Sequence, residues 1–270
     1  SLVGSEMCIR DRAMKKHTLI IGGTRGSGKE LARMLAERGE AVSVVGRRNV
    51  NGAELGHPGI RVCPLDITDV KQTLERIPPL CDDWSSLVFF QKYRADGDNW
   101  TGEWQVSMDA TKRIVDICVD AVRPFPPRPR AIVLIGSVAG KAVIADQPIG
   151  YHAVKAALEH MARFWAVQLG PLGIRVNMVS PHAVLKEESA DFYLGYTKLM
   201  DLYKKIIPLG RMGTSREIAS VVDFLCSDGA AYVTGQNLLV DGGITLPMQE
   251  GPVRAALHMD CLLYTSPSPR

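Results

Sequence analysis

Short apolar runs alternate with helical patterns along most of the chain. The runs are rich in Val and Ile, and they occupy residues 18–21, 41–45, 61–65, 87–90, 131–135, 173–179 and 236–240. Strands that alternate with helices along the whole chain imply parallel βαβ units. The pattern therefore predicts an α/β, doubly wound Rossmann fold with about seven parallel strands, helices on both faces and right-handed βαβ units.

Helical spacing and helix start or stop signals mark most segments between these strands. Helices are predicted over residues 29–38, over 106–122, from 151 onward and over 215–226. Gly39 closes the first of them, a proline-rich run after residue 122 stops the second, and Ser215 is the expected N-cap of the last.

Two further segments are expected near a ligand. Residues 190–207 are predicted to form a helical flap over the substrate. Residues 91–104 carry several charges and two tryptophans, and they follow the fourth strand, where ligands of doubly wound sheets bind. We expect them to form a loop over the site, although a loop merely packed on the surface would have the same composition.

One globular domain is predicted over residues 14–250. The chain has 270 residues, of which 46% are hydrophobic and 23% charged, and this composition fits a single α/β core. Residues 1–13 and 251–270 are predicted to be tails outside the domain. Residues 1–13 and 261–270 lack periodicity and look non-native, whereas Met14 looks like a natural start, so both tails are excluded from the fold prediction.

Charge and cysteine content exclude several classes of function. The net charge of +3 is modest and no dense Lys/Arg cluster is present, so nucleic acid is not an expected partner. No apolar run reaches membrane-spanning length, so no membrane is expected either. The six cysteines form no C-x-x-C pair and no metal spacing with histidine, which predicts no metal site and reduced thiols in a cytoplasmic protein.

The first predicted strand runs into a glycine-rich turn and then a helix. The predicted contacts of this turn with a dinucleotide cofactor are Gly22, Thr24, Arg25, Gly26, Ser27 and Gly28. Glycines let the backbone approach a pyrophosphate, and the helix N-terminus supplies free N–H groups. A tight β–α turn without a ligand uses similar residues, but the position after the first strand favours dinucleotide binding.

The end of the second predicted strand indicates which dinucleotide binds. A site for NAD places Asp or Glu here to hold the ribose 2′-hydroxyl, whereas basic residues accept the 2′-phosphate of NADP. Gly46 stands where the acid would be, Arg47 and Arg48 follow it, and Arg25 projects from the glycine turn. The sequence therefore predicts NADP, the alternative being that these arginines are solvated surface residues.

Residues after the other strands are predicted to complete the cofactor site. Asp66 could accept a hydrogen bond from the adenine amino group, while Thr68 or Asp69 caps the next helix. The remaining predicted cofactor contacts are Ile67, Gln91, Pro181 and Val184.

Tyr151 and Lys155 are the candidate chemical groups. They are four residues apart on a predicted helix, so both side chains lie on one face. A nearby ammonium favours phenolate and would lower the pKa of the tyrosine, and Ser137 could hydrogen-bond the oxygen that Tyr151 protonates. The set would act as a general acid on a carbonyl or a general base on an alcohol. Tyr-x-x-x-Lys also occurs on many helices without chemistry, so the glycine turn is what favours this interpretation.

From about residue 14 to 246 the chain resembles the short-chain dehydrogenase/reductase (SDR) family, in the single-domain branch near the 3-oxoacyl-carrier-protein reductases. The residues that carry the resemblance are Gly22-x-x-x-Gly26-x-Gly28, Asp66, Ser137, Tyr151-x-x-x-Lys155, Asn177, Pro181, Val233-Thr234-Gly235-Gln236 and Asp241-Gly242-Gly243. The resemblance implies that Tyr151 is the acid/base, that Lys155 lowers its pKa and holds the nicotinamide ribose, and that Ser137 orients the substrate oxygen. It also implies a homotetramer or homodimer built from the two central helices.

The chain departs from the family pattern at three places. Phe90-Gln91-Lys92-Tyr93 replaces the usual Asn-Asn-Ala-Gly, and Ser107 aligns with the helix asparagine of the proton relay, so Ser107 is a candidate catalytic residue. Pro181-His182 replaces the usual Pro-Gly, and Lys186 aligns with a threonine. We expect Lys92, Arg94 or His182 to select a polar or anionic substrate.

These features predict an NADP(H)-dependent oxidoreductase that interconverts a small, polar ketone and a secondary alcohol. The alternative is a catalytically idle NADP-binding sensor or scaffold, suggested by the altered residues after the fourth strand and in the relay. An idle site would have no need of Ser137, Tyr151 and Lys155 together. An epimerase of the extended SDR branch is disfavoured because the chain lacks length for that branch's substrate domain.

Overall fold

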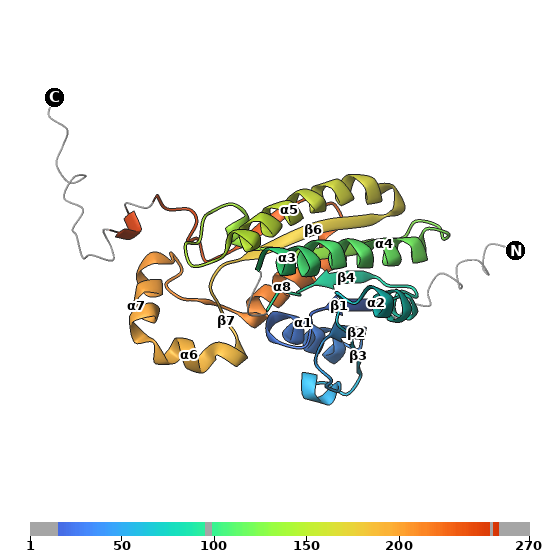
Figure 1. Cartoon of the computed structure of the whole chain (residues 1–270), viewed down its shortest axis with the longest axis horizontal. Helices are drawn as coiled ribbons and strands as arrows, with labels where there is room; N and C mark the ends of the chain where they lie inside the picture. The colour runs from blue at the N-terminus through green and yellow to red at the C-terminus, as the bar shows by residue number, and fades with distance from the viewer. Residues whose placement is uncertain (1–15, 95–98, 249–250, 254–270) are drawn as a thin grey trace, which may run out of the picture.

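Seven parallel strands form one sheet at the centre of the computed structural model, which describes residues 16–94, 99–248 and 251–253. The order across the sheet is β3-β2-β1-β4-β5-β6-β9 (Figure 1). The strands are β1 His17–Ile21, β2 Ala41–Gly46, β3 Ile60–Pro64, β4 Ser86–Phe89, β5 Arg130–Ile135, β6 Ile174–Pro181 and β9 Asn237–Val240. The predicted doubly wound fold is confirmed; the predicted tail over 1–13 and residues 254–270 of the second tail lie outside the described residues.

Helices cover both faces of the sheet (Figure 1). Their bounds are α1 Gly26–Glu37, α2 Val70–Arg76, α3 Asn99–Glu103, α4 Ala110–Val122, α5 Ile149–Leu169, α6 Ala190–Gly195, α7 Thr197–Ile206 and α8 Ser215–Cys226. Alternate strand residues point to opposite faces. Leu19 and Ile21 therefore pack in the core beneath α4 and α5, while Ile20 packs in the core beneath α1 and α8.

The beginnings of α1 and α8 differ from the sequence-based prediction in ways that the contacts explain. Helix α1 begins at Gly26, three residues before its predicted start, so the glycine-rich segment itself forms the first helical turn. Helix α8 is capped by Thr214 rather than Ser215. Thr214 accepts a hydrogen bond from the Glu217 backbone N–H, and the Glu217 carboxylate accepts from the Thr214 backbone N–H, which is a capping box.

The segment expected to be a loop after β4 is largely helical. Helix α3 continues directly into a π-helical turn, Trp104–Asp109, and then into α4. Trp100 and Trp104 pack with ring centroids 5.8 Å apart. A Cβ on Gly150 of α5 would lie 3.0 Å from the backbone oxygen of Asn99, so α3 sits directly on the first turn of α5. Aromatic packing and this contact stabilise a helix in a segment whose polar sequence predicts a loop. Residues 95–98 of the expected loop lie outside the described residues.

The direction in which the chain crosses the sheet reverses between β1 and β4. Strands β1, β2 and β3 follow one another toward one edge, and β4, β5, β6 and β9 follow toward the other. Crevices at such switch points, at the carboxyl ends of the strands, are where doubly wound sheets bind ligands. In the described ranges no helix combines the length and apolarity needed to cross a bilayer.

Candidate active site

A cavity of about 950 Å³ opens at the carboxyl ends of the strands. Its lining includes Ser137 and every residue predicted to bind the cofactor: Gly22, Thr24, Arg25, Gly26, Ser27, Gly28, Arg47, Arg48, Asp66, Ile67, Gln91, Tyr151, Lys155, Pro181 and Val184. Ser107, by contrast, does not line it. Within the described part of the chain, no cluster of three or more His, Cys, Asp or Glu side chains could hold a metal ion.

The glycine turn forms one end of the cavity. Gly22 has φ +81°, and a Cβ on it would lie 2.5 Å from the backbone nitrogen of Gln91. A side chain there would fill the space between β1 and β4, so only glycine permits this close approach. The N–H groups of the first turn of α1, which begins at Gly26, lack helical acceptors. This geometry fits a pyrophosphate.

Three arginines, Arg25, Arg47 and Arg48, surround the same end of the cavity. Arg48 Nη1 donates to the backbone oxygen of Thr24 at 3.3 Å, which ties the end of β2 to the glycine turn. A Cβ on Gly46 would lie 2.8 Å from Thr24 Cγ2, so an acidic side chain at position 46 would require Thr24 to shift. The described residues at the end of β2 therefore offer cations and no carboxylate.

The ends of β3 and β4 supply neutral and acidic groups. Asp66 Oδ1 accepts from the backbone nitrogen of Thr68 at 3.0 Å and from its hydroxyl at 2.7 Å, and the residue faces the cavity. Asp69 caps α2 by accepting from the Gln72 nitrogen at 3.0 Å, as the sequence predicts. Gln91 is held by a 2.7 Å bond from its Nε2 to Thr111 Oγ1.

Ser137, Tyr151 and Lys155 meet at the other end of the cavity. Ser137 lies just after β5 and its Oγ accepts from the Ala139 nitrogen at 3.2 Å. Tyr151 and Lys155 lie one turn apart on α5, with Lys155 Nζ 5.6 Å from the centroid of the tyrosine ring. Lys155 Nζ donates to the backbone oxygen of Ile135 at 2.9 Å, which fixes the amine beside the end of β5.

The pKa of Tyr151 differs from the sequence-based expectation. The expected effect was a lowering by Lys155, but in this structure burial raises the pKa of Tyr151, and the charge of Glu103 adds to the rise. A hydrogen bond with Ser137 opposes both by stabilising the phenolate. Burial also lowers the pKa of Lys155 to about 8. The buried site therefore favours a neutral phenol beside an amine that titrates near neutral pH.

Glu103 is a site residue that the sequence analysis missed. Its side chain is buried, with 3% of the residue exposed, and Oε2 accepts a 3.3 Å hydrogen bond from the Ser107 hydroxyl. Ser107 is 1% exposed, and its hydroxyl donates to this carboxylate rather than lining the cavity. The sequence feature that could have indicated Glu103 is its four-residue spacing from Ser107, which places both residues on one helix face.

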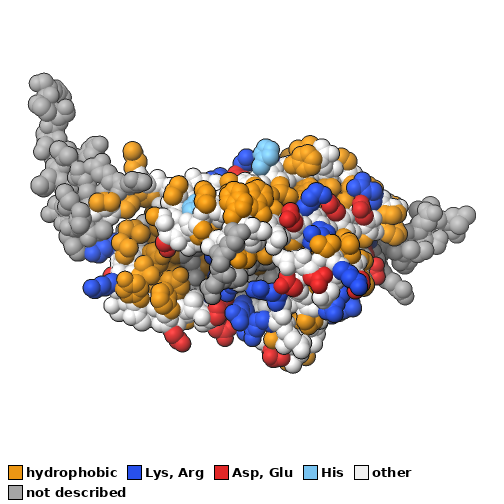
Figure 2. All heavy atoms as spheres, viewed as in Figure 1, with side chains coloured by type: hydrophobic (Ala, Val, Ile, Leu, Met, Phe, Trp, Pro, Cys, Tyr) orange, Lys and Arg blue, Asp and Glu red, His pale blue; other side chains and the backbone are white. Residues whose placement is uncertain are grey.

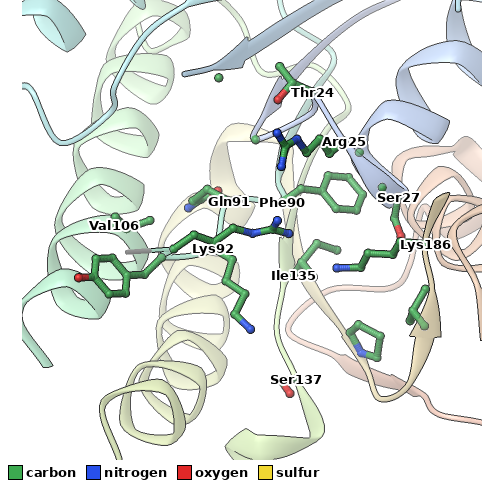
Figure 3. A pocket seen from close by; sticks show the side chains of 18 of the residues that line it. Thr24, Arg25, Ser27, Phe90, Gln91, Lys92, Val106, Ile135, Ser137 and Lys186 are labelled. Carbon is green, nitrogen blue, oxygen red and sulfur yellow. The ribbon is translucent and has the colours of Figure 1, made fainter. Parts of the chain in front are cut away.

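Three further cations line the cavity: Lys92, Arg94 and Lys186. Lys92 Nζ lies 4.6 Å from the centroid of the Tyr151 ring. Figure 3 shows Lys92 and Lys186 reaching into the cavity from opposite sides. The Lys186 stem packs near the glycine turn, since a Cβ on Gly26 would lie 3.2 Å from Lys186 Cδ. Lys92 therefore belongs to the tyrosine end of the cavity and Lys186 to the glycine end.

The predicted flap is helical and borders the cavity. Helices α6 and α7 stand apart from the sheet beside β7 Val184–Leu185, which pairs with β8 Gly213–Thr214 (Figure 1). Phe192, Tyr193 and Tyr203 of these helices line the cavity. The ring of His182 packs edge-on against Tyr203 with centroids 6.3 Å apart, and burial lowers the pKa of this histidine.

Comparison with known proteins adds a family match and close relatives. Residues 22–245 match the family model described as Enoyl-(Acyl carrier protein) reductase. The chain is 30% identical over 264 residues to a cyclohexanol dehydrogenase of Rhodococcus sp. (strain TK6), covering 85% of this chain and 96% of that protein. It is 29% identical over 261 residues to the 3-oxoacyl-(acyl-carrier-protein) reductase FabG of Aquifex aeolicus (strain VF5), covering 85% and 97% of the two chains.

A solved structure has the same fold. A short-chain type dehydrogenase/reductase from Mycobacterium ulcerans superposes with a TM-score of 0.76 at 25% identity, covering 86% of this chain and 90% of that one.

Proposed function

Because the chain belongs to the short-chain dehydrogenase/reductase family, whose members are oxidoreductases acting on alcohols and ketones with nicotinamide cofactors, we propose that it is an NADP(H)-dependent enzyme interconverting a ketone and a secondary alcohol. The observation that carries the proposal is the convergence of Ser137, Tyr151 and Lys155 on the cavity that the glycine turn closes. A nucleotide at that turn and a carbonyl at the tyrosine would share one enclosed space.

Each residue of the set has a distinct part in the proposed reaction. The bound cofactor supplies or accepts a hydride. Ser137 orients the substrate oxygen, and Tyr151 gives its hydroxyl proton to that oxygen during reduction or removes it during oxidation. Lys155, fixed by Ile135, presents its ammonium next to the phenol and stabilises the phenolate that forms.

The choice of NADP rests on the charges at the glycine end. Arg25, Arg47 and Arg48 supply guanidinium donors, and the tight contact between Gly46 and Thr24 disfavours an acid where an NAD site needs one. Guanidinium groups bind phosphate by charge-assisted, bidentate hydrogen bonds. The test of the function is NADPH consumption over a panel of ketones, with NADH as the alternative donor.

The tyrosine end of the cavity supports a substrate that carries a carboxylate. Lys92 Nζ lies over the Tyr151 ring, and Arg94 and Lys186 line the same cavity. Burial lowers the pKa of Lys92 and of Lys186, and the charge of Arg94 lowers both further. Lys186 lies beside the glycine turn, where the pyrophosphate of the cofactor would bind. Lys92 and Arg94 remain for the substrate. His182 packs against Tyr203 of the flap and is less suited to binding the substrate carboxylate.

Lys92→Met should raise KM for an oxo carboxylate about ten- to a hundredfold, because one charge-assisted bond stabilises by roughly 1.5–3 kcal/mol. The KM for the methyl ester of the same compound should change little. Steady-state kinetics on the acid and ester pair measure this difference, and Arg94→Ala should act in the same direction. Lys141→Met removes an exposed lysine that does not line the cavity and serves as the control. Equal changes for acid and ester would contradict a carboxylate substrate.

We also propose that the chain forms a homodimer or homotetramer through α5. Phe164 and Val167 of this helix are 59% and 73% exposed, and Figure 2 shows hydrophobic side chains gathered over α5. Phe164→Asp with Val167→Asp should reduce the mass measured by light scattering to that of a monomer, because two charges would be buried in the interface. Phe125→Asp, which changes an exposed phenylalanine after α4, should leave the mass unchanged. A monomeric wild-type chain would contradict the proposal.

A reducing, cytoplasmic location is supported by the thiols. Cys63, Cys81, Cys118 and Cys226 are free among the described residues. Cys81 and Cys118 are buried, and their sulfur atoms lie in contact. The location proposed is a compartment that keeps thiols reduced, as the cytoplasm does.

A further inference from the structure

A buried carboxylate lies behind the tyrosine end of the cavity and has no part in the proposed reaction. Glu103 is as buried as Lys155, each residue being 3% exposed. Its described hydrogen bond comes from Ser107, and its charge acts on Lys155, Lys92 and Tyr151. A buried carboxylate whose charge acts on three site residues requires an explanation beyond packing.

The placement of Glu103 follows from the packing of α3 on α5. The backbone of Asn99 and Trp100 closes over Gly150, where a Cβ would lie 3.0–3.1 Å from their atoms. Gly150 immediately precedes Tyr151, so the contact brings the last turn of α3 beside the reactive face of α5. The π-helical turn that follows Glu103 lets the chain continue into α4 while both Glu103 and Ser107 face inward.

The charges around Lys155 are otherwise unfavourable to its ammonium form. Burial is the largest cause that lowers the pKa of Lys155, and the charges of Lys92 and Lys186 lower it further. Among the described residues, the charge of Glu103 opposes these causes and raises the pKa of Lys155. The amine donates a hydrogen bond to the neutral backbone oxygen of Ile135, and a buried ammonium also needs a compensating negative charge.

Burial raises the pKa of Glu103, while the charge of Lys155 and the hydrogen bond from Ser107 lower it and favour the carboxylate. We propose that Glu103, held by Ser107, is a positioning residue whose negative charge keeps Lys155 protonated during turnover. The inference rests on the proposed function, and it assigns to Glu103 a part in supporting the amine rather than in touching the substrate. Ser107 then orients the carboxylate instead of joining a relay in place of asparagine. The protein thereby retains an active ammonium despite the two additional lysines in its cavity.

The same charge also raises the pKa of Tyr151, so it supports the ammonium of Lys155 while it weakens the phenol as an acid. Removing the Glu103 charge should therefore make Tyr151 a stronger acid at pH values where Lys155 is still protonated. As the pH rises, Lys155 should lose its proton at a lower pH than in wild type. Damage to the fold would instead lower activity at every pH.

The test compares Glu103→Gln with wild type in two measurements on the full chain. Heteronuclear NMR of isotope-labelled lysine side chains, assigned with Lys155→Met, follows the Lys155 titration directly and needs no turnover. We expect its midpoint to fall by about one pH unit or more in Glu103→Gln, since one unit corresponds to a tenfold change in the protonation equilibrium. Ketone reduction by the variant should then be about five- to tenfold slower than wild type at pH 8 and above, and equal or faster at pH 6.

Two variants control for the loss of a buried acid. Glu103→Asp keeps the charge and should preserve most of the wild-type midpoint. Glu159→Gln removes another buried carboxylate of α5, four residues from Lys155, that pairs with Arg163 and Asn237 instead, and its midpoint should equal that of wild type. An unchanged Lys155 midpoint in Glu103→Gln would overturn the inference, as would an equal loss of activity at pH 6 and pH 8. A wild-type chain that reduces no carbonyl would contradict the proposed function, while the midpoint still reports on Glu103.

Discussion

Tyr151→Phe should lower kcat for ketone reduction by about 10²- to 10⁴-fold, the range that general acid catalysis contributes. The substitution removes the hydroxyl that hydrogen-bonds Ser137 and leaves the ring. The ring contacts with His152, at a centroid distance of 6.4 Å, and with the amines of Lys92 and Lys155 remain available to phenylalanine. Folding and NADPH binding should therefore be nearly unchanged, and the loss should appear in kcat.

Tyr203→Phe is the matched control for this experiment. Tyr203 lines the same cavity but belongs to the flap helix α7, so its hydroxyl should matter little to proton transfer. Stopped-flow NADPH oxidation measures the chemical step, and fluorescence titration measures cofactor binding. A Tyr151→Phe variant as active as wild type would refute the acid/base assignment. A wild-type chain that binds NADPH and consumes none with any ketone would favour the sensor or scaffold alternative.

Arg47→Ala should reduce kcat/KM for NADPH about ten- to a hundredfold and barely change kcat/KM for NADH. One charge-assisted hydrogen bond to the 2′-phosphate stabilises by roughly 1.5–3 kcal/mol, and 1.4 kcal/mol is a factor of ten. NADH lacks that phosphate, so its kcat/KM should not depend on Arg47. Adding Arg25→Ala should deepen the loss, because both guanidinium groups line the same end of the cavity.

The ratio of the two kcat/KM values is the informative measurement here. Arg123→Ala removes an exposed arginine that pairs with Asp120 after α4, outside the cavity, and should leave the ratio as in wild type. Parallel losses with NADPH and NADH in Arg47→Ala would show that the arginine supports the fold or the pyrophosphate instead. A wild-type preference for NADH would contradict the NADP proposal outright.

The sequence predicts the sheet well because its strands are short and mostly apolar, and helical patterns separate them. Every strand of the large sheet lies within two residues of its predicted bounds. The glycine turn, the arginines after β2 and the Ser137, Tyr151 and Lys155 set are likewise recognisable from local spacing, and they line one cavity. Residues at strand ends meet there because the strands are parallel.

Long-range contacts explain what local patterns missed. Residues 99–103 have little helical periodicity, and the packing against Gly150 and the pairing of Trp100 with Trp104 support their helical conformation. Glu103 was overlooked for the same reason, since its burial depends on α5. The pKa of Tyr151 could not be inferred from its spacing to Lys155, because burial and Glu103 outweigh proximity in sequence.

The residues predicted to bind the cofactor and the residues of the flap come from different parts of the fold. The glycine turn and the arginines belong to strand ends fixed by the core, whereas Phe192, Tyr193 and Tyr203 belong to helices outside the sheet. Substitutions in α6 and α7 can therefore alter which molecule is accommodated without disturbing nucleotide recognition or proton donation. Such a division lets related proteins differ in substrate specificity while they keep the same catalytic chemistry.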